Sequence, residues 1–396
     1  MTRPNNEAAR RTVDVMLIAA FLAGITVPFA GFVNRGFRTD TGTSTMENRT
    51  LAPMPEFSLE RQVLAAFPRK FEEYFNDRFG LRDLLVTWHG CTKVFLLGMS
   101  TTDEVLIGKE GWLFYATGNI IPDYRGAHPY SSRELRAWQW ILEERRDYLA
   151  SMGIRYVLFI APEKSTIYPE YLPDAVNRGK RPSRLDQFMS HMKAYSDVEV
   201  IDLREALLRA KTRERVYRRT GTHWNDVGAF VAYEELVKHL AGTYPVLKPL
   251  PRSAFEVREV DDGGSGGCAR LLGLGNQLKD VRITFFPRYR PAAREIEPTP
   301  LLGTRTDAQN RKASLMTQDR TDLPSAVVIR DSFMTFIIPW LAEHFRRSAY
   351  VWGTFDLEVV EDEKPDVVIQ EMAERRLSHR FGNPPKMIGF KLQRPR

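Results

Sequence analysis

The stretch Ala326-Val-Val-Ile-Arg-Asp-Ser-Phe333 is a short apolar run that ends on a polar pair. A run of this kind, without alternation of apolar and polar residues, is typical of a strand buried on both faces of a parallel sheet. An apolar helical pattern follows near 337–346. Because the active sites of open α/β sheets lie beyond the carboxyl ends of the strands, this pattern predicts that Ser332 lies at such an edge.

The same rhythm recurs along the chain. Four more apolar runs have the length of buried strands: 156–160, 198–202, 349–352 and 367–369. Helical patterns stand between the strands, near 183–195, 226–241 and 337–346. Strands that alternate with helices predict the α/β class, with a parallel sheet flanked by helices on both faces. Residues 245–322 fit this rhythm poorly, and we expect there an irregular excursion that shapes a substrate groove.

Two helical regions precede the first of these strands. Apolar residues recur near helical spacing from Phe67 to Leu97, and a long helix is expected from about Ser131 to Met152. Ser131 or Ser132 is the N-cap of the long helix, and Glu134 lies in its first turn. We therefore expect helical structure on both sides of the strand-like piece at 105–115.

The N-terminus carries a membrane-topology signal. Arg3, Arg10 and Arg11 precede an apolar run without charge, from about Val15 to Val33, and this run has about the length of a membrane span. Because flanking arginines stay in the cytoplasm, we expect an uncleaved anchor that sends the rest of the chain outward. A cleaved signal peptide is the alternative, although its apolar region is normally shorter and no good A-x-A site follows here.

These patterns divide the chain into three parts. Residues 1–33 are the cytoplasmic N-terminus and the membrane anchor, and 34–60 are a polar, proline-containing linker. Residues 61–396 are the main domain, with the irregular excursion at about 245–322. We expect a single-pass protein of the inner membrane whose main domain faces the periplasm.

Composition excludes several classes of protein. The 57 Lys and Arg residues outnumber the 50 Asp and Glu residues, but they are scattered rather than clustered, so we expect no nucleic-acid partner. The two cysteines, Cys91 and Cys268, match no metal motif and are either a single disulfide or two thiols. The seven histidines show no H-x-x-x-H or H-E-x-x-H pattern. We therefore expect neither a metal nor an organic cofactor.

A second polar motif supplies a base. In Arg219-Thr-Gly-Thr-His-Trp-Asn-Asp226, His223 precedes a helical pattern that Asp226 is suited to cap. A serine hydroxyl needs a neighbouring base to become a useful nucleophile, and imidazole titrates in the right range. His223 suits this role better than His239 and His344, which lie inside helical patterns. The motif predicts that His223 activates a serine.

Each of these residues could also have an ordinary structural role. Ser332 on its own segment is at least as well accounted for as a helix cap, and a single histidine is usually a surface or structural residue. Lys164 and Tyr168 follow a strand end and either line the cleft or hold the turn. The aromatic residues at 112–115 can stack on sugar rings, but aromatic clusters more often belong to the core.

The two polar motifs resemble those of the alginate O-acetyltransferase family of the AlgJ and AlgX type. Five further blocks, in the same order along the chain, carry the resemblance: Glu47-Asn-Arg49 with Leu51-Ala-Pro53, Phe71 to Arg82, Val105 to Tyr115, Pro162 to Pro173 and Pro365 to Arg376. The likeness covers nearly all of the chain beyond the anchor. Five ordered blocks and two catalytic motifs make a specific signal.

The resemblance implies a circularly permuted fold similar to that of SGNH hydrolases, in which the histidine precedes the serine. It implies a periplasmic O-acetyltransferase that acetylates the hydroxyls of an alginate-like exopolysaccharide through an acyl-enzyme on Ser332, with His223 as the base. It also implies a multi-pass membrane O-acyltransferase that supplies the acetyl group. Two alternatives stay open: a polysaccharide deacetylase or esterase, and a non-catalytic subunit that binds polysaccharide.

The sequence departs from the family at one position. The family usually has an aspartate two residues before the histidine, and here that residue is Gly221. Glu371, Asp331 or Asp226 can replace this acid in space, and Glu371 is the first choice because a carboxylate in an apolar strand requires a partner. Gly221 is equally compatible with a Ser–His dyad that works without an acid, or with a relative that only binds polysaccharide.

Overall fold

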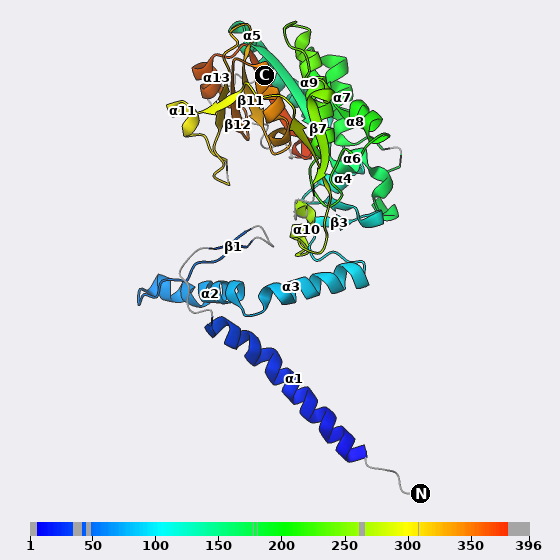
Figure 1. Cartoon of the computed structure of the whole chain (residues 1–396), viewed down its shortest axis with the longest axis vertical. Helices are drawn as coiled ribbons and strands as arrows, with labels where there is room; N and C mark the ends of the chain where they lie inside the picture. The colour runs from blue at the N-terminus through cyan, green and yellow to red at the C-terminus, as the bar shows by residue number, and fades with distance from the viewer. Residues whose placement is uncertain are drawn as a thin grey trace. The chain divides into compact units, whose positions relative to one another are not determined.

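The computed structural model describes residues 6–34, 42–44, 49–176, 178–179, 181–260, 266–307 and 309–378. The chain forms two compact units, drawn in Figure 1. Unit 1 comprises 1–102 with 269–277, and unit 2 comprises 103–268 with 278–396. The helical segment at 61–102 thus belongs with the N-terminal part of the chain, whereas the sequence assigned it to the main domain.

Unit 1 is mainly helical. Its elements before residue 103 are α1 (Asn6–Asn34), β1 (Thr43–Ser44), β2 (Arg49–Thr50), α2 (Arg61–Arg78), α3 (Arg82–Cys91) and a π-helical turn (Thr92–Leu96). The ring of Phe32 at the end of α1 lies 4.7 Å from the ring of Phe75 in α2. The bounds of α2 and α3 confirm the helical structure that the sequence predicted from Phe67 to Leu97. Much of the expected linker, 35–41 and 45–48, lies outside the described residues.

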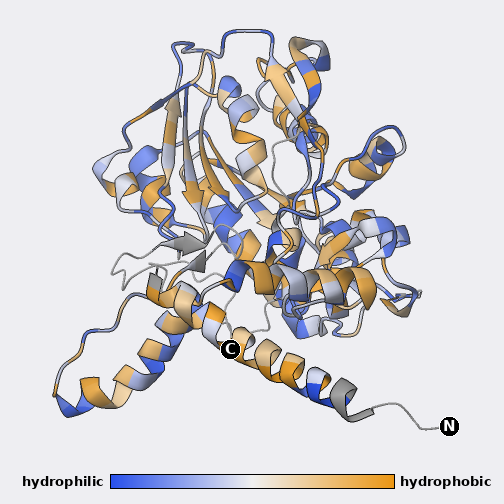
Figure 2. Ribbon diagram, turned by 60° about the horizontal axis from the view of Figure 1, so that its bottom comes forward, coloured by the Kyte–Doolittle hydropathy of each residue, from blue (hydrophilic) through white to orange (hydrophobic). Residues whose placement is uncertain are grey.

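α1 contains the only segment of the described chain that is long and apolar enough to cross a membrane, Arg10–Val33. Large apolar side chains along it, such as Leu17 and Phe21, are more than half exposed. In Figure 2 the helix that leads in from the N-terminus is mostly orange, which marks hydrophobic residues. An exposed apolar helix of this length fits a membrane anchor or a signal sequence.

Unit 2 is built on a seven-stranded sheet with the strand order β6-β5-β13-β11-β12-β10-β9. The strands are β5 (Arg155–Ala161), β6 (Glu199–Asp202), β9 (Arg294–Ile296), β10 (Ser314–Thr317), β11 (Ser325–Arg330), β12 (Arg347–Trp352) and β13 (Val367–Ala373). The five strands from β6 to β12 are parallel, and β10 and β9 add an antiparallel edge. The predicted α/β class is confirmed, with β11 in the centre of the sheet.

Each central strand is apolar along its length because both faces of the sheet are covered. Alternate residues of a strand point to opposite faces, so Val328 lies in one core cluster and its neighbour Val327 in the other. The first face packs against α8 (Arg204–Lys211), α9 (Asp226–Ala241) and α12 (Ile338–Leu341). The second face packs against α5 (Ser132–Ser151), α7 (Arg184–Tyr195) and α13 (Leu357–Glu363).

The remaining elements of unit 2 are short. They include the hairpin of β3 (Val105–Ile107) and β4 (Leu113–Tyr115), the helices α4 (Ile120–Tyr124), α6 (Lys164–Ile167) and α11 (Pro300–Gly303), and several single 3-10 turns. α10 (Gly267–Leu271) crosses the boundary between the two units. Ser131 caps α5 in a capping box with Glu134, as the sequence predicted.

The segment at 245–322 differs from the irregular excursion that the sequence predicted. It contains an antiparallel ribbon of β7 (Phe255–Val260) and β8 (Arg282–Pro287), whose Phe255 and Phe285 pack on Phe230 of α9. It also contains β9 and β10, which extend the main sheet. These strands were missed because they lack the continuous apolar runs of the central strands, and partners distant in sequence create their order.

Candidate active site

Ser332 lies directly beyond the carboxyl end of β11, and its neighbour Asp331 fixes the turn. Asp331 Oδ1 accepts the backbone N–H of Phe333 at 2.9 Å, and Asp331 Oδ2 accepts the backbone N–H of Ala373 at 2.9 Å. One buried carboxylate thus joins the serine turn to the end of the adjacent strand β13. Because buried backbone N–H groups require partners, these two bonds restrict the turn to one conformation.

Glu371 of β13 binds the backbone of this turn. Its Oε2 accepts the backbone N–H of Asp331 at 2.7 Å, and its side chain is fully buried. Burial, followed by the charge of Asp331, holds the pKa of Glu371 well above its usual range. Although burial opposes ionisation of Asp331, the charge of Arg375 and hydrogen bonds lower its pKa. Glu371 is therefore the protonated member of the pair and Asp331 the charged one.

The loop before α9 brings His223 to the serine. His223 Nε2 lies 2.7 Å from Ser332 Oγ, and Nδ1 lies 2.9 Å from Thr222 Oγ1. The imidazole ring packs edge-on against Phe333, with ring centroids 4.8 Å apart. When Nδ1 carries the proton and donates it to Thr222 Oγ1, Nε2 is free to accept the serine proton. This is the arrangement that a serine nucleophile and its general base require.

The structure therefore brings Ser332 and His223 together but does not bring Glu371 to the imidazole. Within the described ranges, no carboxylate makes a hydrogen bond to either ring nitrogen of His223. Asp331 bonds to backbone N–H groups, and Asp226 Oδ2 accepts the N–H of Phe285 at 3.1 Å. The hydroxyl of Thr222 occupies the place of an orienting acid, and no sequence signal distinguished that residue.

Asp226 also does not cap α9 as the sequence predicted. The N-cap is Asn225, whose Oδ1 accepts the N–H of Gly228 at 3.1 Å. Asn and Asp are equally good caps, so the sequence alone does not decide between neighbours. The Phe285 bond instead ties Asp226 to the β7–β8 ribbon.

Only one of the two backbone N–H groups at Ser332 and Phe333 is available to bind an oxyanion. Backbone N–H groups that follow a strand can help to hold an oxyanion, but the N–H of Phe333 is bonded to Asp331. In the described part of the chain the N–H of Ser332 has no hydrogen-bond partner. Ser332 therefore offers one backbone donor of the kind that stabilises a developing negative charge.

Lys164 is a buried side chain that binds the backbone of the loop carrying His223. Its Nζ donates to the carbonyl oxygens of Arg218 at 2.9 Å and Arg219 at 3.0 Å, and also to that of Gly221. The side chain is buried, and burial lowers the pKa of Lys164 to about 8. Three carbonyl acceptors satisfy all three donors of an ammonium group. Lys164 thus fixes the loop that carries His223.

The aromatic residues near this loop belong mostly to the core. Trp112 and Phe114 are buried, and Trp112 stacks on Tyr171 with ring centroids 4.6 Å apart. Tyr168 is also buried, and its hydroxyl accepts the N–H of Val216 at 3.0 Å. These side chains are thus packed under the site rather than free to stack on a sugar ring.

The described residues contain no group of three or more His, Cys, Asp or Glu side chains arranged to hold a metal ion. Cys91 and Cys268 are unpaired thiols. Cys268 is buried, and burial raises its pKa to about 11, which disfavours the reactive thiolate. Among the described side chains, Ser332 and His223 are accordingly the candidate nucleophile and base.

His223 stays neutral at physiological pH. Burial, and then the charge of Arg375, lowers the pKa of His223 to about 4. Arg218 and Lys164 act in the same direction, whereas Asp331 opposes them. The neutral imidazole is the base form, so His223 is ready to accept the serine proton.

This environment predicts an unusual pH profile. Protonation of His223 removes the base, so activity should be lost only as the pH falls toward its pKa of about 4. With a neutral small acetyl ester, kcat/KM should stay nearly constant down to about pH 5, which is below the ordinary histidine pKa of about 6.5. Stopped-flow hydrolysis with a parallel check of folding measures this profile. A midpoint near 6.5 would contradict the described environment of His223.

Comparison with known proteins gives a family match. A family model described as "SGNH hydrolase-like domain, acetyltransferase AlgX" matches residues 105–310, slightly more than half of the 396 residues. His223 lies inside the matched range, and Ser332 lies beyond it.

Two curated relatives are named probable alginate O-acetylase AlgJ. The protein from Pseudomonas syringae is 27% identical over 48% of this chain and 46% of its own length. The protein from Pseudomonas aeruginosa is 28% identical over 39% of this chain and 37% of its own length. The chain thus aligns with less than half of the length of each of these relatives.

A solved structure supports the fold. Bacillus cereus PatB1 is 14% identical, with a TM-score of 0.52, over 70% of this chain and 97% of that chain. At this identity the likeness concerns the fold alone.

Proposed function

Because the chain belongs to the AlgX-type family of SGNH hydrolase-like acetyltransferase domains, we propose that it transfers acetyl groups to the hydroxyls of an exopolysaccharide. The observation that carries the proposal is the 2.7 Å hydrogen bond between His223 Nε2 and Ser332 Oγ at the carboxyl edge of the sheet. The names of the AlgJ relatives support acetylation of an alginate-like polymer.

The reaction proceeds in two steps through an acyl-enzyme. His223 Nε2 takes the proton of Ser332 as Oγ attacks the carbonyl carbon of the acetyl donor, and the imidazolium then returns this proton to the leaving group. In the second step His223 takes the proton of an acceptor hydroxyl, whose oxygen attacks the acetyl–serine ester. The proton passes back to Ser332 Oγ as it leaves. No electron transfer is involved, and the serine is regenerated.

Thr222 and Lys164 support these steps without touching the reacting atoms. Thr222 Oγ1 lies 2.9 Å from Nδ1 and orients the imidazole ring, since its hydroxyl can accept the Nδ1 proton while Nε2 faces Ser332. Lys164 holds the carbonyl oxygens of the loop that carries His223. A neutral hydroxyl stabilises an imidazolium less than a carboxylate does, and Asp331 is the nearby charge that favours the imidazolium.

Transfer and hydrolysis differ only in the acceptor. With an oligosaccharide acceptor present, we expect the acetyl group of a small activated ester to be transferred to the oligosaccharide. Without an acceptor, we expect it to be released as free acetate. Measurement of acetyl release and acetylated sugar, with and without the acceptor, decides between them. Release that an acceptor does not divert would identify an esterase. Absence of both activities with competent donors would identify a subunit that only binds polysaccharide.

We also propose that α1 anchors the protein in the inner membrane with unit 2 in the periplasm. Arg10 and Arg11 lie at the N-terminal end of Arg10–Val33, the single candidate span in the described residues. A multi-pass membrane O-acyltransferase is the expected supplier of acetyl groups, as the family resemblance implies.

This topology makes a direct prediction. Alkaline phosphatase fused after residue 60 should be active, because this enzyme folds only outside the cytoplasm, and a fluorescent reporter that folds only inside should be dark. A control fusion before residue 10 should give the opposite pattern. A cytoplasmic signal from the fusion after residue 60 would overturn the proposed orientation.

A further inference from the structure

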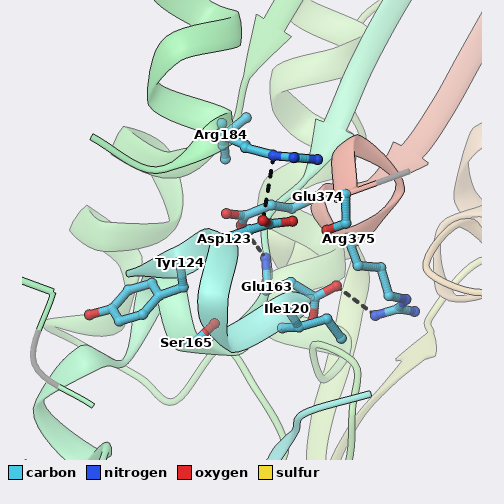
Figure 3. A pocket seen from close by; sticks show the side chains of 10 residues that line it. Ile120, Asp123, Tyr124, Glu163, Ser165, Arg184, Glu374 and Arg375 are labelled. Atoms are coloured by element: carbon cyan, nitrogen blue, oxygen red, sulfur yellow. Dashed lines mark hydrogen bonds and ion pairs between the residues drawn. The ribbon is translucent and has the colours of Figure 1, made fainter. Parts of the chain in front are cut away.

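In unit 1, α3 and the π-helical turn after it expose a row of large apolar side chains. This row, here called the α3 stripe, consists of Leu81, Leu84, Leu85, Trp88, Phe95 and Leu96. Leu84 is 62% exposed, Trp88 72% and Phe95 58%. Most large apolar side chains of unit 2 are buried instead, such as Ile120 in the pocket of Figure 3, which is 5% exposed. A contiguous apolar surface of this kind is typical of an interaction site.

The stripe occupies one side of the helix, because its members recur at intervals of three and four residues along α3. The opposite side is covered by unit 1 itself. Gly90 is buried there, and a Cβ atom on it would lie 3.0 Å from Leu274 Cδ2 and 3.1 Å from the carbonyl oxygen of Leu272. The helix therefore has one side packed against its own unit and one apolar side that the described chain leaves exposed.

The turn between α2 and α3 contacts the candidate membrane span. The backbone N–H of Gly80 donates to the carbonyl oxygen of Pro28 at 3.2 Å. A Cβ atom on Gly80 would clash with this oxygen, so glycine is required for the close approach. Pro28 lies about 8 Å before Val33 along the axis of α1, at a rise of 1.5 Å per residue. The start of α3 is therefore held near the end of the span.

The composition of α3 suits the boundary between lipid headgroups and acyl chains. Tryptophan is enriched at this depth, and helices that lie in the boundary carry leucine and aromatic residues on their lipid-facing side. Trp88 and Phe95 are such residues, whereas the exposed Asp83 lies on another side of α3. Contact with lipid would remove the stripe from water, which is favourable for apolar surface.

We propose that the α3 stripe lies in the headgroup–acyl boundary of the bilayer, on the side of the membrane where α1 ends. The occupant of this surface is lipid rather than a second copy of the chain or another protein, because the stripe begins where Gly80 contacts the span. α3 then forms a second contact with the membrane and holds unit 1 against its surface. This inference rests on the proposed anchoring by α1.

The test measures which solvent surrounds single positions of α3. The full-length protein with Cys91→Ser and Cys268→Ala receives one new cysteine, carries one fluorescent label, and is reconstituted in vesicles of phosphatidylethanolamine and phosphatidylglycerol. Leu84→Cys and Trp88→Cys report on the stripe, and Asp83→Cys is the matched exposed position on another side of the same helix. Iodide in the water should quench the two stripe labels about fivefold less than the Asp83→Cys label. Lipids with a nitroxide near the headgroup should quench the stripe labels more strongly.

A charge in the stripe should release it from the bilayer. Trp88→Glu should raise iodide quenching of the label at Leu84→Cys to within about twofold of the value at Asp83→Cys, because a carboxylate is disfavoured at this depth. Leu208→Glu is the control, since it places the same charge at an exposed leucine of α8 in unit 2 and should leave the quenching unchanged. Thermal melting of each variant identifies a fold defect.

The outcomes separate lipid from other occupants of the stripe. Equal iodide quenching at Leu84→Cys and Asp83→Cys would show that water covers the stripe and would overturn the proposal. Protection from iodide without quenching by the nitroxide lipids would show that protein covers it, which also overturns the proposal. Washing with alkaline carbonate tests the anchor separately, because it removes peripheral proteins and leaves spanning ones. A chain that is washed off lacks the anchor, and nitroxide quenching in unwashed vesicles then decides independently whether lipid covers the stripe.

Discussion

Ser332→Ala and His223→Ala should each reduce acetyl transfer by about 10⁴- to 10⁶-fold, and the double variant should be hardly worse than either single one. The reason is that nucleophile and base act as one unit through the 2.7 Å bond between Nε2 and Oγ. Without the base the hydroxyl keeps its proton, and without the hydroxyl the base has nothing to activate.

Initial rates of transfer from an activated acetyl ester, with purified variants, measure this effect. Thr101→Ala is a suitable control, because Thr101 lies in unit 1 and its hydroxyl donates to the carbonyl of Leu272 in the same unit. Losses that multiply in the double variant would show that Ser332 and His223 act independently and would remove the basis of the mechanism.

Gly221→Asp should increase acetyl transfer by about 10- to 100-fold, the range of effects seen when partners of a catalytic group are changed. The substitution restores the acid that the family has two residues before its histidine. A carboxylate near Nδ1 stabilises the imidazolium better than the hydroxyl of Thr222 does.

The backbone permits this substitution. The φ angle of Gly221 lies outside the left-handed region, so a side chain causes no backbone strain. A Cβ atom would lie 3.0 Å from Cβ and 3.3 Å from Cδ of Arg218, so the Arg218 backbone as well as its side chain must move by a few tenths of an ångström. Gly221→Asn is the matched control for shape without charge. Equal rates in the Asp and Asn variants would show that a carboxylate at this position does not assist His223.

Several features of the fold could be predicted because they depend on local patterns. Continuous apolar runs identify strands that are covered on both faces, and the edge at which parallel strands end is common to all of them. These two rules placed Ser332 at that edge, whereas His223 was joined to it by the need of a serine for a base and by the family resemblance. The structure confirms that the two side chains meet.

The role of Glu371 could not be predicted because it depends on register. The sequence indicated correctly that a carboxyl group in an apolar strand needs a partner, but not which one. The parallel pairing of Ile329 in β11 with Gln370 in β13 places Glu371 next to the N–H of Asp331. A shift of one residue would turn Glu371 to the other face of the sheet.

Thr222 was missed for a different reason. The direction of the Thr222 side chain depends on the loop that Lys164 holds, and that contact joins residues more than fifty positions apart. Loop geometry of this kind is set by tertiary contacts and leaves no local pattern.

The identity of the atom that carries the acetyl group tests the central claim most directly. The full-length protein is mixed with an activated acetyl ester in the absence of acceptor, quenched within one turnover, digested and analysed by mass spectrometry. The account predicts one added acetyl group on the peptide that contains Ser332, absent in Ser332→Ala and discharged when an acidic oligosaccharide is added. An acetyl group on another residue that is discharged to the sugar, or full transfer by Ser332→Ala, would contradict it.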